Sequence, residues 1–404
     1  MRLPCNDALL LSLVAAVGNI FPMSTTVRQQ RIATSRRVVV KVGTNSITGE
    51  NGRLDHGVLG DFARQIADVI HQGRQVILVA SGAVGAGLAE LDLPARPREL
   101  PMLQATAAVG QGRLMQAFYE AFGQHDVKVA QVLVTRDAFE DRRRYLNIRN
   151  TLTTLAGLGV LPILNENDAV AVDEIRYGTD VFSAKFGDND TIAAHVANML
   201  DAHVLVLLSN VDGVLDDGAV IDVIQQVNDD ALSVVSTTRS KLGSGGMGSK
   251  MRAAGMVTSA GNVAVIANSR TRDVIPRLLA GEKLGTVFVP STRRMSSRRR
   301  WIGQTSRTAG RILVDAGAAT ALRQRGKSLL PSGIVAVSGT FSRGAVVDIL
   351  DPSGHSIARG VTNFSAADID RVKGMKCAQV TKLLGDTAAA EIVHRNNMTM
   401  AQDA

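Results

Sequence analysis

The chain has 404 residues, a length that favours two or three domains over one. Apolar residues make up 45% of it and charged residues 20%, a composition typical of globular proteins that bury a sizeable core. The formal net charge of +8 favours anionic partners such as nucleotides or nucleic acid. Its two cysteines, Cys5 and Cys377, stand at opposite ends of the sequence, which excludes a disulfide framework and a CxxC metal site and predicts a reducing, cytoplasmic location.

The N-terminal residues are expected to lie outside the fold. Residues 9–21 form an apolar run of signal-peptide length, but the segment before them carries only Arg2, offset by Asp7. The run is too short to span a bilayer, so no membrane association is predicted. We interpret residues 1–35 as an N-terminal extension, with Met23 as an alternative start of the chain.

Between residues 36 and 290, short apolar strands alternate with helical patterns. The predicted strands are VVVKV (38–42), QVILVA (75–80), VKVAQVLV (127–134), VLPIL (160–164), HVLVLL (203–208) and NVAVIA (262–267). Apolar residues at helical spacing fall between them, at about 54–70, 103–122, 146–155 and 191–200. This alternation predicts an α/β domain whose mainly parallel sheet is sandwiched between helices.

The sequence changes character after residue 290. Residues 291–305 include STRRMSSRRR and are predicted to form an exposed, arginine-rich linker. In residues 306–392, short strands such as GRILVD and AVVDIL are separated by Gly, Pro, Ser and Asp, which is typical of a small β-barrel or sandwich. Residues 393–404 are interpreted as a C-terminal tail.

Polar or glycine-rich clusters follow four of the predicted strands directly: GTNS (43–46), SGAVGAG (81–87), NEND (165–168) and SNVDG (209–213). Each cluster alone could be turn chemistry, because Gly, Asn and Asp are ordinary turn residues. In open α/β sheets, however, ligands bind beyond the carboxyl ends of the strands. Four such clusters at one edge therefore predict a binding site.

The residue types in these clusters favour phosphoryl transfer. They combine two lysines, Lys41 and Lys250, with glycine backbone, short acids and amides, and this reaction depends mainly on positioning and charge neutralisation. The stretch LGSGGMGSK (242–250) suits a phosphate cradle, although Ser249 between Gly248 and Lys250 breaks the P-loop spacing. The histidines are scattered, so neither a Ser–His–Asp triad nor a histidine metal site is predicted.

Five motifs, KVGTNSI, ASGAVGAG, NENDAVA, FGDNDTIAA and SGGMGSK, resemble in this order those of the glutamate 5-kinases of the amino-acid kinase superfamily. The segments KSLLPSGIVAVSGTFSRGAVVDI and IARGVTNFS resemble the PUA domain that many of these kinases carry. The resemblance implies an amino-acid kinase fold over 36–290, followed by a small β-barrel-like PUA domain over 306–392.

The resemblance also implies roles for individual residues. The expected catalytic residues are Lys41, Lys250 and Asp188, with Asp188 orienting the lysines. The expected glutamate-binding residues are Ser81, Asn165, Asp168, Asn189 and Asp190. The expected nucleotide-binding residues are Lys41, Ser209, Asn210, Ser244, Gly245, Gly246, Met247, Gly248, Ser249 and Lys250. ATP would bring Mg²⁺ on its phosphates, with no dedicated protein ligands.

Two features depart from the common pattern of these kinases. Asn210 stands where an Asp is common, which leaves that nucleotide contact open. The stretch VDEIRYGTDVFSAK (172–185), between NEND and GDND, is longer than in some relatives and is interpreted as an enlarged substrate loop.

The implied activity is ATP-dependent phosphorylation of the L-glutamate γ-carboxylate, the first step of proline synthesis. The resemblance further implies feedback inhibition by proline, a homo-oligomer, and transfer of the product to glutamyl phosphate reductase. One alternative is another small-acid kinase of the same superfamily. An alternative from a different class is an RNA-binding protein, based on the PUA-like domain and on the arginines at 293, 294 and 298–300, which have Trp301 as their only neighbouring aromatic residue.

Overall fold

The computed structural model describes residues 27–49, 53–170, 189–227, 246–290, 297–306, 308–376, 379–380, 383 and 391–401. The chain divides into two compact units. The N-terminal unit comprises Met1–Arg136 and Arg149–Thr292, and the C-terminal unit comprises Asp137–Ile148 and Arg293–Ala404. The short stretch Asp137–Ile148 therefore belongs to the C-terminal unit, although the residues before and after it in the sequence belong to the N-terminal unit.

The N-terminal unit is built on an eight-stranded sheet of order β3-β4-β2-β1-β5-β9-β10-β8. Its strands are β1 (Arg37–Val42), β2 (Gln75–Ala80), β3 (Val129–Val134), β4 (Leu161–Glu166), β5 (Val204–Ser209), β8 (Val223–Ile224), β9 (Val263–Asn268) and β10 (Thr286–Phe288). Neighbouring strands are parallel except for β9 and β10. The predicted mainly parallel sheet is therefore confirmed. Strands β6 (Leu215–Asp216) and β7 (Ala219–Val220) form a separate hairpin.

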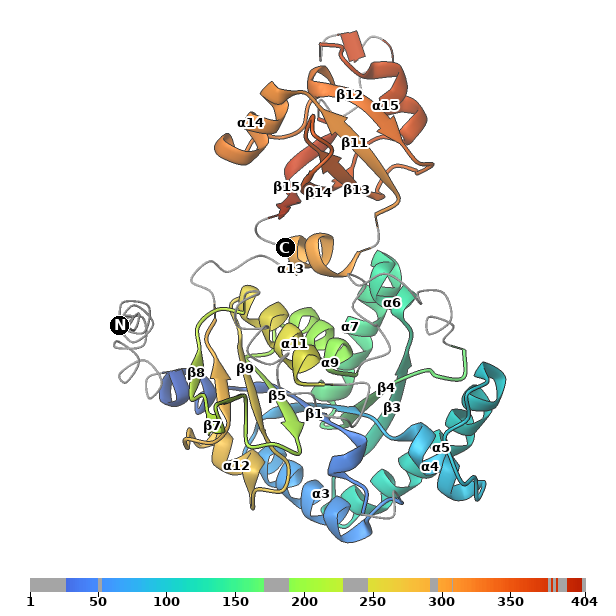
Figure 1. Ribbon diagram of the computed structural model, residues 1–404, viewed down its shortest axis with the longest axis vertical. Coiled ribbons are helices and arrows are strands. Elements are labelled where there is room, and N and C mark those ends of the chain that lie inside the picture. The colour runs from blue at the N-terminus through green and yellow to red at the C-terminus, as the bar shows by residue number, and fades with distance from the viewer. Residues whose placement is uncertain are drawn as a thin grey trace, which may run out of the picture. The chain divides into compact units, whose positions relative to one another are not determined.

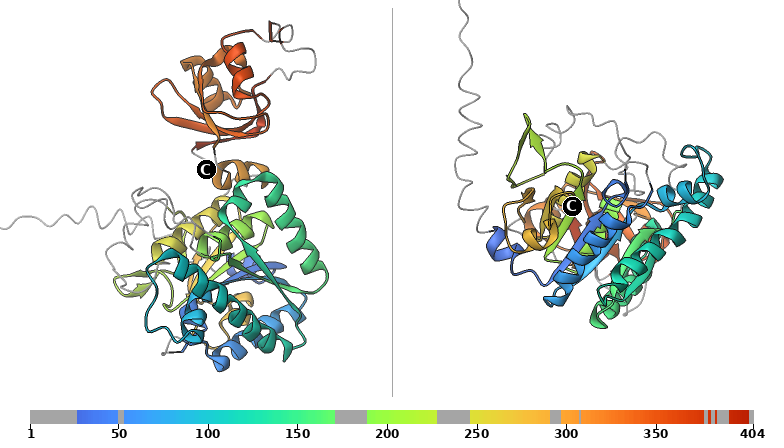
Figure 2. Two further views of the ribbon diagram at one scale, coloured as in Figure 1. Left: turned by 90° about the vertical axis from the view of Figure 1, so that its right-hand side faces the viewer. Right: turned by 90° about the horizontal axis from the view of Figure 1, so that it is seen from below.

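Helices lie on both faces of this sheet (Figure 1). The helices of this unit are η1 (Arg28–Ile32), η2 (Thr44–Ser46), α3 (His56–His71), α4 (Ala83–Glu90), α5 (Leu100–Gly123), α9 (Asn189–Met199), α11 (Met247–Ser259) and α12 (Val274–Leu279). Nearly all of α6 (Arg136–Glu140) and the first half of α7 (Arg142–Gly157) lie in the stretch that belongs to the C-terminal unit. Helices α3 and α5 run side by side along one face (Figure 2, right), and α9 packs with α11 on the other. None of the described helices is long and apolar enough to cross a membrane.

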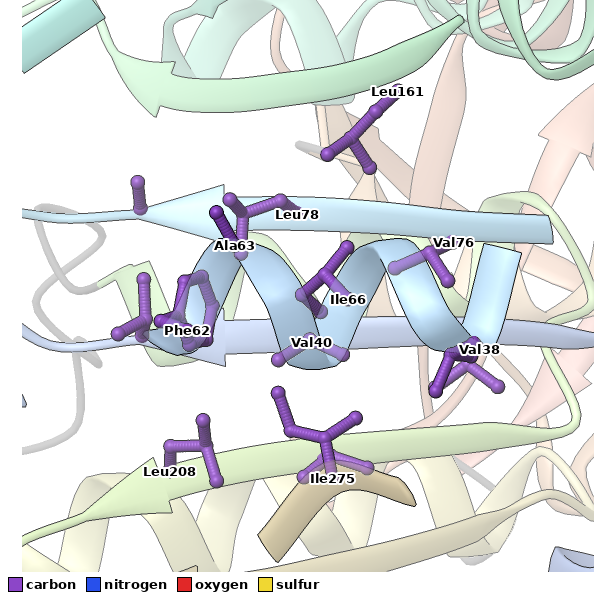
Figure 3. Packing of buried hydrophobic residues seen from close by; sticks show 14 of the residues in the cluster. Val38, Val40, Phe62, Ala63, Ile66, Val76, Leu78, Leu161, Leu208 and Ile275 are labelled. Carbon is purple, nitrogen blue, oxygen red and sulfur yellow. The ribbon is translucent and has the colours of Figure 1, made fainter. Parts of the chain in front are cut away.

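Helix α3 shows how the sequence builds the first of these faces. Asp55 caps its N-terminus by accepting hydrogen bonds from the backbone N–H groups of Gly57 and Val58. One stripe of the helix is apolar and fully covered, and Phe62, Ala63 and Ile66 pack onto the strands (Figure 3). The helix is therefore specified locally by its cap and globally by the strands that it covers.

The alternation of side chains along β1 decides where its lysine points. Val38, Val40 and Val42 belong to the core cluster under α3 (Figure 3 shows Val38 and Val40). Because successive side chains of a strand point to opposite faces, Lys41 lies on the other face, the one covered by α9. Lys41 is thus placed against α9 by the same register that buries the valines.

The described part of the expected N-terminal extension belongs to the fold. Val27 and Ile32 lie in the core cluster, and Arg28 is buried with them. The Arg28 guanidinium donates to Asp222 Oδ1 at 2.7 Å and to three backbone carbonyls of the loop before β10. The polar composition of this segment predicted an excluded tail, because a buried arginine whose acceptors lie about 200 residues away or more cannot be recognised in sequence alone.

The C-terminal unit contains a separate five-stranded sheet of order β12-β11-β13-β14-β15. Its strands are β11 (Gly310–Val314), β12 (Ile334–Ser338), β13 (Val346–Leu350), β14 (Ser356–Thr362) and β15 (Val393–Met400). Its helices are α13 (Ser297–Arg300), η3 (Trp301–Thr305), α14 (Ala316–Arg325), η4 (Pro331–Gly333) and α15 (Ala366–Val372). Strand β15 pairs with β14, so residues 393–400, expected to be a tail, complete the sheet instead.

The linker after residue 290 also differs from the expectation of an exposed segment. Trp301 and Ile302 are buried, and Trp301 Nε1 donates to the carbonyl oxygen of Phe139 at 3.0 Å. The Arg142 guanidinium lies 5.1 Å from the centre of the Trp301 ring and 5.4 Å from that of Tyr145. Trp301 thus packs within the C-terminal unit against a stretch drawn from between β3 and β4.

Substituting Trp301 should lower the stability of the C-terminal unit. Trp301→Ala removes a buried aromatic ring and one hydrogen bond, so we expect a loss of about 3–5 kcal/mol in the free energy of unfolding. Trp301→Phe retains most of the packing and should lose about 1–2 kcal/mol. Urea unfolding followed by circular dichroism measures both. Unchanged stability of Trp301→Ala would show that this segment is only loosely attached.

Candidate active site

Those predicted site residues that the structure describes gather at the carboxyl edge of the large sheet. Lys41 lies in β1, where it is paired with Val79 of β2 and Leu207 of β5, so it occupies a central strand. Ser81 follows β2, Asn165 lies near the end of β4, and Ser209 ends β5. Because these strands are parallel, their carboxyl ends meet at one edge of the sheet.

The loops after β1 and β2 come into contact beside Lys41. Gly43 begins η2, and a Cβ atom at Gly43 would lie only 3.7 Å from Lys41 Nζ. Gly82, between β2 and α4, has a φ of +120°, which side chains of L-residues rarely adopt, and it lies against Thr44. Gly43 therefore lies beside the lysine ammonium, and the backbone conformation at Gly82 brings the second loop against the first.

One carboxylate bridges the two predicted lysines. Asp190 Oδ1 lies 2.8 Å from Lys41 Nζ, and Asp190 Oδ2 accepts a hydrogen bond from Lys250 Nζ at 3.2 Å. The three residues come from separate elements: β1, the first turn of α9 and the first turn of α11. The Asp190 side chain is fully buried, and the two lysine side chains are 6% and 9% exposed.

This arrangement concentrates ammonium groups in a covered setting. Burying an ammonium group without a partner costs several kcal/mol, so two neighbouring lysines require a carboxylate between them. Asp190 supplies this carboxylate, so two buried ammonium groups are held close together at this edge of the sheet. Such a site favours the binding of an anion and the stabilisation of negative charge that develops in a reaction.

The side chain of Asn189, next to Asp190, is held by Ser81. Asn189 Nδ2 donates to Ser81 Oγ at 2.8 Å, which joins the start of α9 to the loop before α4. The Asn189 Oδ1 atom is buried and has no hydrogen-bond partner within the described residues. A buried acceptor without a donor is costly, so this oxygen suits a ligand that brings an N–H group, such as an ammonium.

A second polar pair lies at the end of β4. Asn165 is 2% exposed, and its Nδ2 donates to Gln111 Oε1 of α5 at 2.7 Å. Gln111 was not among the predicted site residues. It lies in a long predicted helix whose other positions face either the core or the solvent. Nothing in the sequence marks this one polar residue as part of a site.

The remaining acceptor residues are only partly described. Asp168 is half-buried in the turn after β4, where the Asn167 backbone N–H donates to the Val134 carbonyl oxygen at 2.8 Å. Its role toward glutamate stays a prediction. Asp188 and the 172–185 stretch lie outside the described residues. The role expected for Asp188 stays a prediction, and among the described residues Asp190 lies between the two lysines.

The nucleotide-side residues lie around β5 and the start of α11. Ser209 is buried at the end of β5, whereas Asn210 is exposed. Helix α11 begins after Gly246, which has no side chain to cap it, so Met247, Gly248, Ser249 and Lys250 present the first turn. A helix N-terminus of this kind favours phosphate. Ser244 and Gly245 of the same motif lie outside the described residues.

His195 is buried in the helix that carries Asn189 and Asp190. Burial, and to a smaller extent the positive charge of Arg136, lower the pKa of His195 from 6.5 to about 4. The folded protein therefore holds this imidazole neutral, and we find no role for it in binding or transferring an anion.

The lowered pKa of His195 predicts a loss of stability on acidification. Between about pH 6.5 and pH 4 the unfolded chain binds a proton at this position and the folded chain does not, so stability falls as the pH falls through this window. The loss attributable to His195 should be on the order of 3 kcal/mol. Urea unfolding at pH 7 and pH 4.5 should show a smaller pH dependence for His195→Gln than for the wild type.

His71, in the last turn of α3, provides the matched control, because its side chain is exposed to solvent, whereas that of His195 is buried. His71→Gln should retain the pH dependence of the wild type. Identical behaviour of His195→Gln and the wild type would contradict the assignment.

Both parts of the chain are similar to known protein families. The model of the amino acid kinase family matches residues 36–268, and that of the PUA domain matches residues 310–384. The glutamate 5-kinase of Moorella thermoacetica is 44% identical over 382 residues, which cover 92% of this chain and 99% of that protein. The glutamate 5-kinase of Herpetosiphon aurantiacus is 45% identical over 369 residues, covering 90% and 97%. That of Caldanaerobacter subterraneus is 42% identical over 373 residues, covering 91% and 98%.

Among solved structures, the carbamate kinase of Giardia lamblia bound to AMP-PNP is similar, with a TM-score of 0.47 and 19% identity. The match covers 64% of this chain and 100% of that one. The chain belongs to the amino acid kinase family, and it carries a C-terminal PUA domain. Within that family, its similarity over nearly the full length of the relatives places it among the glutamate 5-kinases.

Proposed function

We propose that the protein transfers the γ-phosphoryl group of ATP to the γ-carboxylate of L-glutamate, which forms L-glutamyl 5-phosphate for proline synthesis. The observation that carries this proposal is the Lys41–Asp190–Lys250 arrangement, which gathers two buried ammonium groups at the carboxyl edge of the sheet. The relatives named glutamate 5-kinase support the choice of acceptor.

The acceptor makes a general base unnecessary. A γ-carboxylate is already ionised at pH 7, so no proton has to be removed before attack. One carboxylate oxygen forms a bond to the γ-phosphorus while the bond from that phosphorus to the β–γ bridging oxygen breaks, and ADP leaves with the electron pair. The main obstacle is the approach of one anion to another, and the two lysine ammonium groups offset this repulsion.

Asp190 would hold the lysines on either side of the transferring group. Its two oxygens each contact a lysine, and the positive charges of the lysines would oppose the approach of a metal ion to this carboxylate. Mg²⁺ would therefore be held mainly through the ATP phosphates, where it neutralises their negative charge. The open first turn of α11 would contribute backbone N–H groups to the same phosphates.

The amides and Asp168 would hold the acceptor. Asp168, in the turn after β4, offers a counter-charge for the substrate ammonium, and the buried Asn189 Oδ1 offers it an acceptor. Ser81 and Asn165 are fixed by hydrogen bonds at the ends of neighbouring strands and would complete the pocket.

The activity is tested by measuring ATP consumption with glutamate, aspartate, acetylglutamate, carbamate and uridylate as acceptors, and only glutamate should support rapid turnover. Lys41→Ala and Lys250→Ala should each lower kcat about 100-fold or more, because compensation of the transition-state charge is lost. Lys128→Ala, at an exposed position before β3, is the matched control and should keep full activity. Normal turnover by Lys41→Ala would remove the proposed mechanism.

We further propose feedback inhibition by proline through the glutamate pocket. Proline carries an ammonium and an α-carboxylate like those of glutamate but has no γ-carboxylate to phosphorylate. Asp168→Asn should therefore raise both the KM for glutamate and the proline IC50, with little effect on the KM for ATP. Asp126→Asn is a suitable control, because Asp126 is exposed and its φ of +57° is tolerated by Asn. A proline IC50 that does not rise with glutamate concentration would instead require a separate regulatory site.

A further inference from the structure

The orientation of the Asn165 amide is set by the backbone. The N–H group of Glu166 donates to Asn165 Oδ1 at 2.9 Å, in a buried setting. Since a backbone N–H can only donate, the atom that it contacts must be the amide oxygen. The other end of the Asn165 side chain is therefore the NH₂ group, which acts as a donor.

The orientation of the Asn165 amide determines that of the Gln111 amide. The Asn165 NH₂ group lies 2.7 Å from the Gln111 side chain, so the Gln111 atom in contact must be its oxygen, Oε1. The Gln111 NH₂ group is then directed away from Asn165. Within the described residues this Nε2 atom has no hydrogen-bond partner, and Gln111 is half-buried. The chain of amides thus ends in two N–H donors that are available to a ligand.

Backbone packing holds Gln111 in place. The preceding residue, Gly110, lies so close to α4 that a Cβ atom there would be 1.8 Å from the carbonyl oxygen of Ala83. Ala83 begins α4, directly after Ser81 and Gly82. Helix α5 is therefore in direct backbone contact with the first turn of α4, next to the loop that carries Ser81. Gln111 cannot shift along this contact without a steric clash.

The position of Gln111 relative to the lysines suggests which part of the acceptor it contacts. Its partner Asn165 lies in β4, which is separated from the Lys41 strand β1 by β2. Neighbouring strands are about 4.8 Å apart, so β4 lies about 10 Å from β1. If the reacting carboxylate is at the lysines, the far end of the acceptor faces β4.

We propose that Gln111 donates from Nε2 to the α-carboxylate of the acceptor and thereby selects substrates that carry this group. The inference rests on the proposed function, since it takes the reacting γ-carboxylate to lie at Lys41 and Lys250. Gln111 acts in binding and selection at the end of the pocket remote from phosphoryl transfer.

The test compares glutamate with isoglutamine, in which the α-carboxylate is replaced by a carboxamide and the γ-carboxylate is intact. The kcat/KM of the full-length enzyme is measured for both acceptors in the wild type, Gln111→Met and Gln111→Glu. Gln111→Met has nearly the same shape but no N–H donor, so its preference for glutamate over isoglutamine should fall about 10- to 100-fold. Gln111→Glu can still accept from Asn165 and can also accept from a carboxamide, so isoglutamine should become its better substrate.

Gln116→Met provides the matched control, because Gln116 lies on the same helix with its side chain exposed and hydrogen bonded to Glu120. This variant should keep the preference of the wild type. The proposal is overturned if Gln111→Met and Gln111→Glu lose activity equally with both acceptors, since a role confined to positioning Asn165 would affect both alike. A wild type that phosphorylates neither acceptor would instead contradict the proposed function, so the two failures are distinguishable.

Discussion

The structure of the site depends on a single buried carboxylate, that of Asp190, held between two lysines from different elements. Neither lysine could be covered to this extent beside the other without it, because the desolvation of two like charges would outweigh any gain from packing. The carboxylate therefore fixes how β1, α9 and α11 meet. It also holds two ammonium groups together where the strands end.

This constraint separates the site into two ends with different chemistry. Near β1, α9 and α11, ammonium groups and an uncapped helix N-terminus suit phosphates and a reacting carboxylate. Near β2 and β4, amide and hydroxyl groups are joined in neutral hydrogen-bonded pairs, Asn189 with Ser81 and Asn165 with Gln111. Charge thus serves the reaction at one end, and directional hydrogen bonds serve recognition at the other. The close contact of α4 with α5 keeps the recognition end rigid.

Features with a local signal could be predicted from the sequence. The alternation of apolar strands and amphipathic helices predicted the mainly parallel sheet, and the motifs after the strands indicated the edge that carries the candidate site. The sequence did not predict the burial of η1 and of the linker around Trp301, or the pairing of β15 with β14. In each of these a polar or short segment is ordered by distant partners, such as Asp222 for Arg28 and Phe139 for Trp301.

The sequence by itself therefore determined the class of fold, the order of its elements and the types of residue available for phosphoryl transfer, because periodicity and turn chemistry are properties of neighbouring residues. Only the tertiary structure decided that Asp190 holds both lysines and that Gln111 completes the amide chain. The physical reason is that hydrogen bonds and ion pairs require atoms within about 3 Å. Which of several acids and amides reaches that distance depends on strand register and helix packing, and no single motif encodes these.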